Sequence, residues 1–155
     1  MKKYLMLMVA AASITTATFA QNHEKNEKKA HANVPASVKQ AFEKQYPGTK
    51  AKWDNEDGKF EAGFKHNGHE MSVLYNSNGT VEETEMEIPV TQLPAAANSY
   101  ITQHKLGKIS EAAKITKANG EVNYEAEVKG KDVIFDAAGK FLKEIKDWFF
   151  MVRLS

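Results

Sequence analysis

The chain has 155 residues, of which 42% are hydrophobic and 26% charged, so it is neither low-complexity nor wholly disordered. Its formal net charge of +1 excludes a protein that binds nucleic acid through a general basic excess. The absence of cysteine excludes thiol catalysis, zinc–cysteine sites and disulfides.

Residues 1–20 have the pattern of a secretory signal peptide. Lys2 and Lys3 give a positive start, an apolar stretch covers residues 5–14, and a Thr-Phe-Ala sequence ends the segment at Ala20. The apolar stretch is shorter than the roughly 18 residues that a membrane-spanning helix needs. We therefore expect cleavage after Ala20, a periplasmic or secreted product, and no membrane insertion after cleavage.

A polar, highly charged leader is predicted at residues 21–33, because it contains no apolar periodicity. After cleavage, His23 would be the third residue. A free amine, two amide nitrogens and this imidazole can enclose Cu(II) or Ni(II) in a square plane. A histidine at this position also occurs by chance, and cyclisation of Gln21 would block the amine.

Residues 34–146 contain two similar halves, 34–88 and 90–146. A Val-Pro pair at 34–35 opens the first half, and a Leu-Pro pair at 93–94 opens the matching part of the second. Apolar residues at helical spacing follow each pair, and proline suits the first turn of a helix. Each half therefore begins with a predicted helix.

Three glycine turns, about ten residues apart, follow each predicted helix. They are Asp57-Gly58, Asn67-Gly68 and Asn78-Gly79 in the first half, and Asn119-Gly120, Lys129-Gly130 and Ala138-Gly139 in the second. Such turns join antiparallel strands, so each half is predicted to be a helix followed by a four-stranded meander, an α+β fold. One half alone is marginal in size, so the two halves should share an interface.

The two halves can be aligned residue by residue. The alignment matches Leu74 with Ile134, and Trp53 with Ile115. Since Ile115 is apolar, the second match favours a buried Trp53.

Three segments resemble the exported PepSY-like proteins, which are also described as similar to the β-lactamase inhibitor protein. They are VPASVKQAFEKQYPGTKAKW at 34–53, GKFEAGF at 58–64 and LYNSNGTVEETEMEIPVTQLPAA at 74–96. The resemblance implies a tandem repeat whose helices cover one face of a sheet and leave the other face open and concave. It also implies export in Gram-negative bacteria and, by analogy, binding or inhibition of an enzyme.

The sequence departs from the inhibitor at its contact turn. The inhibitor presses a hairpin turn with an acidic and an aromatic residue into its target, whereas the best-matching turn here is His-Asn-Gly-His at 66–69. Inhibition of a β-lactamase itself is therefore not expected.

No catalytic signature is present in the sequence. There is no Gly-x-Ser-x-Gly motif, no glycine-rich phosphate loop and no thiol. We expect a non-catalytic binding module that needs no cofactor and binds an unidentified protein. Its expected role is to inhibit or regulate an extracytoplasmic enzyme, a peptidase or other hydrolase. An envelope structural or stress-associated protein is the alternative, and a hydrolase is a more distant one.

A partner-binding face is predicted from the strand alternation. One helix can cover only one face of each half, and residues out of phase with the apolar set should line the other. These residues are Glu61, Lys65, Ser72, Leu74, Asn123, Glu125 and Ile134. Leu74 and Ile134 would be apolar centres rimmed by charge, as in many interfaces. The alternative is that sheet twist or packing between the halves buries both.

The sequence allows two interpretations for each of two further residue groups and for one segment. His66 and His69 face each other across a turn and could share a metal ion as a weak site, although exposed polar turn residues are the favoured explanation. Glu83, Glu85 and Glu87 share one strand face, which is either solvated or suited to a basic partner. The apolar tail 147–155 is predicted to pack on the second half, with a partner-docking segment as the alternative.

Overall fold

The computed structural model describes residues 33–56 and 58–146. The first half contains α1 (Ala36–Gln45), β1 (Lys52–Glu56), β2 (Lys59–His66), β3 (His69–Asn76) and β4 (Val81–Glu87). A short 3-10 helix, η1 (Val90–Gln92), leads into the second half. That half contains α2 (Ala95–Gln103), β5 (Ile109–Lys117), β6 (Val122–Val128), β7 (Lys131–Asp136) and β8 (Phe141–Lys146). The expected signal peptide, His23 and the tail 147–155 lie outside the described residues.

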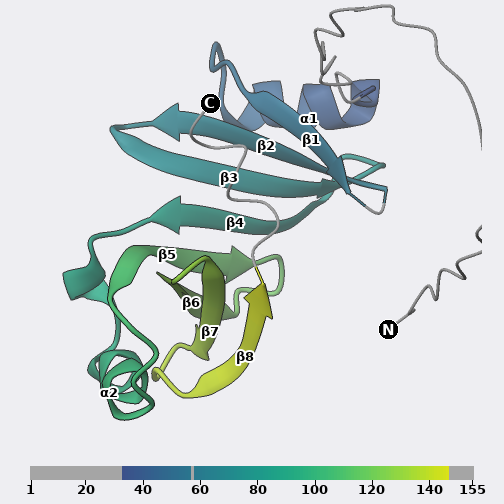
Figure 1. The fold of residues 1–155 in the computed structure, drawn as a ribbon. Helices are drawn as coiled ribbons and strands as arrows, with labels where there is room; N and C mark the ends of the chain where they lie inside the picture. The colour runs from purple at the N-terminus through teal and green to yellow at the C-terminus, as the bar shows by residue number, and fades with distance from the viewer. Residues whose placement is uncertain (1–32, 57, 147–155) are drawn as a thin grey trace, which may run out of the picture.

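All eight strands form one antiparallel sheet in sequence order, β1 to β8. β4 pairs with β5, so the two four-stranded meanders become one continuous sheet (Figure 1). In this view β1–β4 lie in the upper part of the molecule with α1, and β5–β8 curl in the lower part with α2. The α+β class and the repeated order of one helix and four strands are confirmed.

Both helices begin directly after a proline. The carbonyl of Pro35 accepts a 3.1 Å hydrogen bond from the Lys39 amide, and the carbonyl of Pro94 accepts a 3.3 Å bond from the Asn98 amide. Pro35 and Pro94 have φ of −57° and −53°, values that the proline ring imposes and that lead into a helix. The two Val/Leu-Pro pairs are thus the helix starts that their sequence predicts.

The last turn of each meander packs against its own helix. Gly79 has φ +86°, and a Cβ there would lie 2.7 Å from the carbonyl oxygen of Ser37 in α1. Gly139 has φ +83°, and a Cβ there would lie 2.8 Å from the backbone nitrogen of Ala97 in α2. The same glycine therefore permits the same close approach in both halves.

Each half has its own apolar core between helix and strands. In the first, Phe42 of α1 packs edge-on against Phe64 at 5.1 Å and against Trp53 at 5.4 Å between ring centroids. In the second, Ala97 and Ile101 of α2 pack in one cluster with strand residues. These strand residues are Ala112, Ala126, Val128, Val133 and Phe135.

The sequence alignment of Trp53 with Ile115 was wrong. Trp53 pairs with Ala62, whose counterpart Ala126 pairs with Ala112. Trp53 and Ala112 are therefore equivalent, and both contribute to a core. Ile115 is three residues further along and lies on the other face of its strand, because strand side chains alternate with a period of two.

Candidate binding face of the sheet

The strand register places all seven predicted partner-binding residues on one face of the sheet. Glu61 lies directly opposite Leu74 on β2 and β3, and Glu125 lies directly opposite Ile134 on β6 and β7. Opposite residues in a ladder share a face, as do residues two apart along a strand. Lys65, Ser72 and Asn123 follow from that alternation. We call the side that carries these seven residues the binding face.

The β4–β5 seam connects the two halves of the binding face. Ser72 lies opposite Glu85, Glu85 opposite Ile115, and Ile115 opposite Asn123. One row of side chains thus crosses from β3 to β6, about 14 Å at a strand spacing of about 4.8 Å. Glu83 joins a parallel row between Leu74 and Lys117.

The sequence-based list of site residues omitted Ile115 and the acidic residues of β4. Glu83, Glu85 and Glu87 do share one face, as their alternation predicts, and this face is the binding face. The alternation along this strand was the sequence signal by which these three residues could have been added to the list of face residues. Ile115 was not recognised as a face residue, because the wrong alignment matched it with Trp53 and no local pattern shows that β4 pairs with β5.

Burial differs between the two ends of the binding face. In the first half, Lys65 is exposed, while Glu61 and Leu74 are half-buried. In the second half, Asn123 and Ile134 are each only 4% exposed and Ile115 is 8% exposed. Ser72, 7% exposed, and the half-buried Glu125 complete the set. The binding face is therefore apolar and buried near β5–β7 and more open near β2 and β3.

The electrostatics of the face centre on the acidic strand β4. Burial raises the pKa of Glu83, and the carboxylates of Glu85 and Glu82 raise it further. Lys117 and Lys143 act in the opposite direction and lower that pKa. Lys143 belongs to β8, where it lies opposite Ile134. Its effect on a β4 carboxylate is consistent with a sheet that curls, so that β8 faces back toward β4.

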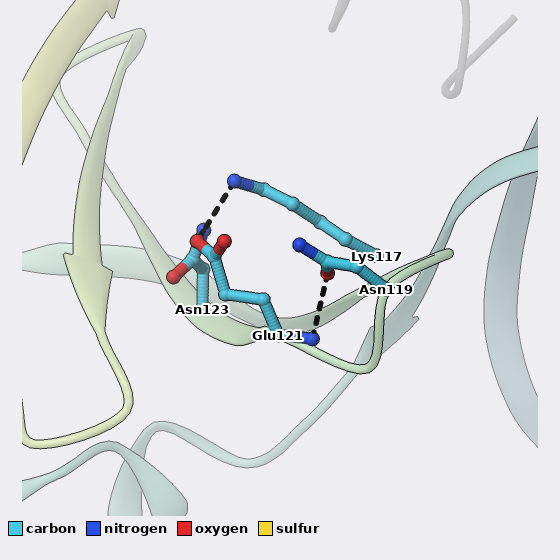
Figure 2. A network of polar contacts seen from close by, with 4 residues as sticks. All are labelled: Lys117, Asn119, Glu121 and Asn123. Carbon is cyan, nitrogen blue, oxygen red and sulfur yellow. Dashed lines mark hydrogen bonds and ion pairs between the residues drawn. The ribbon is translucent and has the colours of Figure 1, made fainter.

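A polar network supports the binding face at the β5–β6 turn (Figure 2). Lys117 Nζ lies 2.8 Å from Glu121 Oε1, and Asn123 Nδ2 donates to the same oxygen at 3.1 Å. The Glu121 amide donates to Asn119 Oδ1 at 2.9 Å. The hydrogen bond from Lys117, followed by that from Asn123, lowers the pKa of the Glu121 carboxyl. The network fixes the Asn123 side chain by its amide nitrogen.

Asn123 Oδ1 and Glu127 Oε2 are buried oxygens on this face that accept no hydrogen bond within the described part of the chain. The other carboxylate oxygen of Glu127 accepts a 2.8 Å bond from Ser110 Oγ. A buried acceptor without a donor costs stability.

The predicted histidine pair does form, but its surroundings do not complete a metal site. His66 lies opposite His69, and its ring packs edge-on against Tyr46 with 5.3 Å between centroids. Among residues 33–56 and 58–146, no group of three or more His, Cys, Asp or Glu side chains could hold a metal ion. His23 lies outside the described residues.

Solved structures share this fold. A protein from Bacteroides eggerthii, described as one of the "putative periplasmic proteins", aligns with a TM-score of 0.60 and 17% identity, over 72% of this chain and 87% of that one. A DUF2874 family protein from Bacteroides ovatus gives 0.59 and 18%, over 76% and 92%. A BLIP-like protein from Bacteroides fragilis gives 0.54 and 22%, over 73% and 88%. These similarities show the fold.

Sequence comparison gives the family. No curated protein matches the chain. No helix in the described residues has the length and apolar character needed to cross a membrane. The family model described as "Putative beta-lactamase-inhibitor-like, PepSY-like" matches twice, at residues 15–82 and 58–143. The chain belongs to the PepSY-like, beta-lactamase-inhibitor-like family.

Proposed function

We propose that this protein is an exported, non-catalytic module that binds another protein through the binding face. The observation that carries the proposal is the pair of Glu61 with the half-buried Leu74 on the open part of the face, which the second half repeats as Glu125 with the buried Ile134. A face with apolar centres inside a charged rim is a common design for protein recognition. The continuous sheet joins both pairs into one surface.

The arrangement of the helices supports an accessible face. Val73 of the first core lies opposite Thr84, which lies opposite Thr116 on β5. Thr116 shares its strand side with Ala112 of the second core. Both helices accordingly back the same side of the sheet, and the binding face is the other side.

The chemistry of the face indicates the kind of partner. Glu61, Glu83, Glu85, Glu87 and Glu125 give it acidic character, and carboxylates near apolar centres favour a segment that carries both basic and apolar side chains. Such a segment on an extracytoplasmic peptidase or other hydrolase would make this protein an inhibitor or regulator of that enzyme.

The expected location agrees with the comparisons. Residues 1–20 have the pattern of a signal peptide, and the Bacteroides eggerthii neighbour is described as periplasmic. A periplasmic or secreted protein meets partners of the cell envelope. N-terminal sequencing of the protein from that compartment should begin near Gln21.

Capture from periplasmic extract, followed by binding measurements with the purified partner, tests the function. We expect Leu74→Ser and Glu85→Lys to weaken binding at least tenfold while the fold is retained. The control is Gln40→Lys, which adds a positive charge at an exposed position of α1. Equal affinity of all three variants would contradict the proposed face.

The same experiment separates the alternatives. Diffuse recovery of many envelope components would favour a structural or stress-associated role. Turnover of a peptide or ester substrate by the purified protein alone would favour a hydrolase.

A further inference from the structure

We infer that the outer edge of β1 pairs with the β1 edge of a second copy of this chain, in an antiparallel register centred on Trp53. The sheets of the two copies then become one continuous sheet. The inference stands on the backbone and the side chains of β1 and does not depend on the proposed function.

The outer edge of β1 has no neighbouring strand in the described part of the chain. β1 is the first strand in the sheet order and pairs with β2 alone. The Asn55 amide donates to Asp54 Oδ1 at 2.7 Å instead of to a β2 carbonyl, so this N–H points away from β2. Backbone groups of alternate residues point to the same edge of a strand. The N–H and C=O groups of Ala51, Trp53 and Asn55 therefore follow the outer edge.

The contacts of α1 leave this edge accessible. Near the start of the helix, Ser37 Oγ donates to the carbonyl of Ser77, which follows β3, at 2.8 Å. At the other end, the Tyr46 ring packs against His66, the last residue of β2, with 5.3 Å between centroids. The helix thus lies over β2 and β3, and Asn55 on the outer edge is exposed.

One register makes β1 complementary to its own copy. With Trp53 opposite the second copy's Trp53, Ala51 lies opposite Asn55, and their outward N–H and C=O groups can exchange hydrogen bonds. Lys52 then lies opposite the second copy's Asp54, and Asp54 opposite its Lys52, at the positions where side chains of paired strands are closest. The Asn55 amide gains a backbone acceptor, so the Asp54 carboxylate can turn to the lysine.

The neighbouring registers are disfavoured by charge. A shift by two residues in one direction places Lys52 opposite the second copy's Lys52. The same shift in the other direction places Asp54 opposite Asp54. Like charges directly opposite each other destabilise a strand pair, so the charges of β1 select the register centred on Trp53.

The other edge of the sheet is protected from such pairing. An extra residue, Leu142, interrupts the ladder of β8 with β7. Bulges of this kind protect an edge strand from a second chain. β1 contains no proline, and its ladder with β2 has no shift. The two edges therefore differ, and β1 is the one suited to a second copy.

The pairing places the binding faces of both copies on the same side. Its two-fold axis is perpendicular to the sheet, because residues directly opposite each other share a face. Lys52 and Asp54 lie opposite Gly63 and Glu61 of β2, so they belong to the binding face. The charged pairs thus connect the two binding faces. This consequence rests on the proposed function, whereas the dimer itself does not.

Sedimentation equilibrium of the mature chain, residues 21–155, tests the pairing. A contact along one short strand is smaller than a standard interface, so we expect a weak dimer that forms at about 0.1–1 mM. The average mass should rise toward that of two chains over this range. A monomer at every concentration up to about 1 mM would overturn the inference.

Charge exchange makes the test specific to β1. Lys52→Asp places carboxylates opposite each other, and Asp54→Lys places ammonium groups opposite each other, so each variant should lose about tenfold or more in association constant. An equimolar mixture of the two variants should regain the dimer, because every charged pair then joins opposite signs. Single variants that dimerise as the parent does, or a mixture that stays monomeric, would overturn the register.

A matched control and amide signals locate the contact. Lys108→Asp makes the same change of charge at an exposed position between α2 and β5, and should leave the association unchanged. As the concentration rises, the amide signals of Trp53 and Asn55 should shift, while those of Lys143 and Ile145 in β8 should not. Shifts in β8 instead of β1 would overturn the inference. A dimer that binds no envelope protein would support the inference and contradict only the proposed function.

Discussion

Tyr75 illustrates how one residue connects the strands to α1. It is fully buried, and its hydroxyl donates a 3.4 Å hydrogen bond to Gln45 Oε1 of α1. Burial, together with Tyr46, raises the pKa of Tyr75 from 10.0 to about 12. The folded protein therefore holds this proton more tightly than the unfolded chain does.

This pKa predicts a loss of stability in alkali. Because the folded pKa lies above the unfolded one, the contribution of Tyr75 is complete below about pH 10 and is lost as the pH rises toward 12. Tyr75→Phe should make the fall in the free energy of unfolding over this range smaller, at a cost of about 1 kcal/mol at pH 7 for the lost hydrogen bond. Urea unfolding at several pH values, with Tyr124→Phe as control, measures both effects. An unchanged pH dependence would contradict the assignment.

The pKa of Glu83, on the binding face, is shifted in the same direction. Burial raises its pKa, and Glu85 and Glu82 raise it further, so the ionised form is disfavoured in the folded state. Its favourable contribution is present below the unfolded pKa of 4.5 and is lost as the pH rises through the higher folded value.

Glu83→Gln should therefore stabilise the protein at pH 7, by less than about 1 kcal/mol because solvent screens this partly exposed carboxylate, and the gain should shrink below pH 4. Thermal unfolding at pH 7 and pH 3.5 measures the difference. Glu87→Gln, on the same strand and face but exposed, should change the stability by less than about 0.5 kcal/mol. A larger gain at pH 3.5 than at pH 7 would show that the sign is wrong.

At the scale of elements, each meander is attached to its helix by the turn after its third strand. Gly139 and Gly120 have the same φ of +83°, but their surroundings differ. A Cβ at Gly139 would meet Ala97 N at 2.8 Å and Pro94 Cβ at 2.9 Å, whereas a Cβ at Gly120 would meet nothing within 4 Å. A comparison of alanine variants at the two glycines thus distinguishes the stability cost of backbone strain from the cost of steric contact.

Gly120→Ala should cost about 1 kcal/mol, because only the strained φ contributes. Gly139→Ala should cost about 2–4 kcal/mol, because α2 or the turn must also move. Chemical denaturation of the two variants measures the difference. Equal costs would mean that the turn does not hold α2 in place.

The elements themselves could be predicted because their signals are local. A proline at each helix start and a glycine with positive φ at each turn act over a few residues, and the sequence places them correctly. The contacts between the halves could not be predicted in this way. The position of Ile115 depends on the pairing of β4 with β5, which no turn joins and no short pattern encodes. The seven face residues were found because alternation along a strand is local, whereas the burial of Ile134 depends on the curl of the whole sheet.

At the scale of the whole molecule, the seam between β4 and β5 makes two small halves into one unit. Its pairing continues beyond the ladder: the Ile88 amide donates to the Ala112 carbonyl at 2.9 Å, and the Ala118 amide donates to the Glu82 carbonyl at 2.8 Å. Ile88 belongs to the first half by sequence, yet it is buried in the core around α2. The halves therefore share side chains as well as backbone hydrogen bonds.

This sharing predicts that neither half is stable alone. Residues 33–89 would lose the β5 partner of β4 and expose Ile88, and a half of this size has little stability to lose. We expect residues 33–89 and 90–155 to show no cooperative urea transition when expressed separately, because each would carry an unpaired central strand. Residues 33–155 should unfold in a single transition that circular dichroism and tryptophan fluorescence report together. A cooperative transition of residues 33–89 would show that the repeats are independent domains, and the binding face would then have to be divided between them.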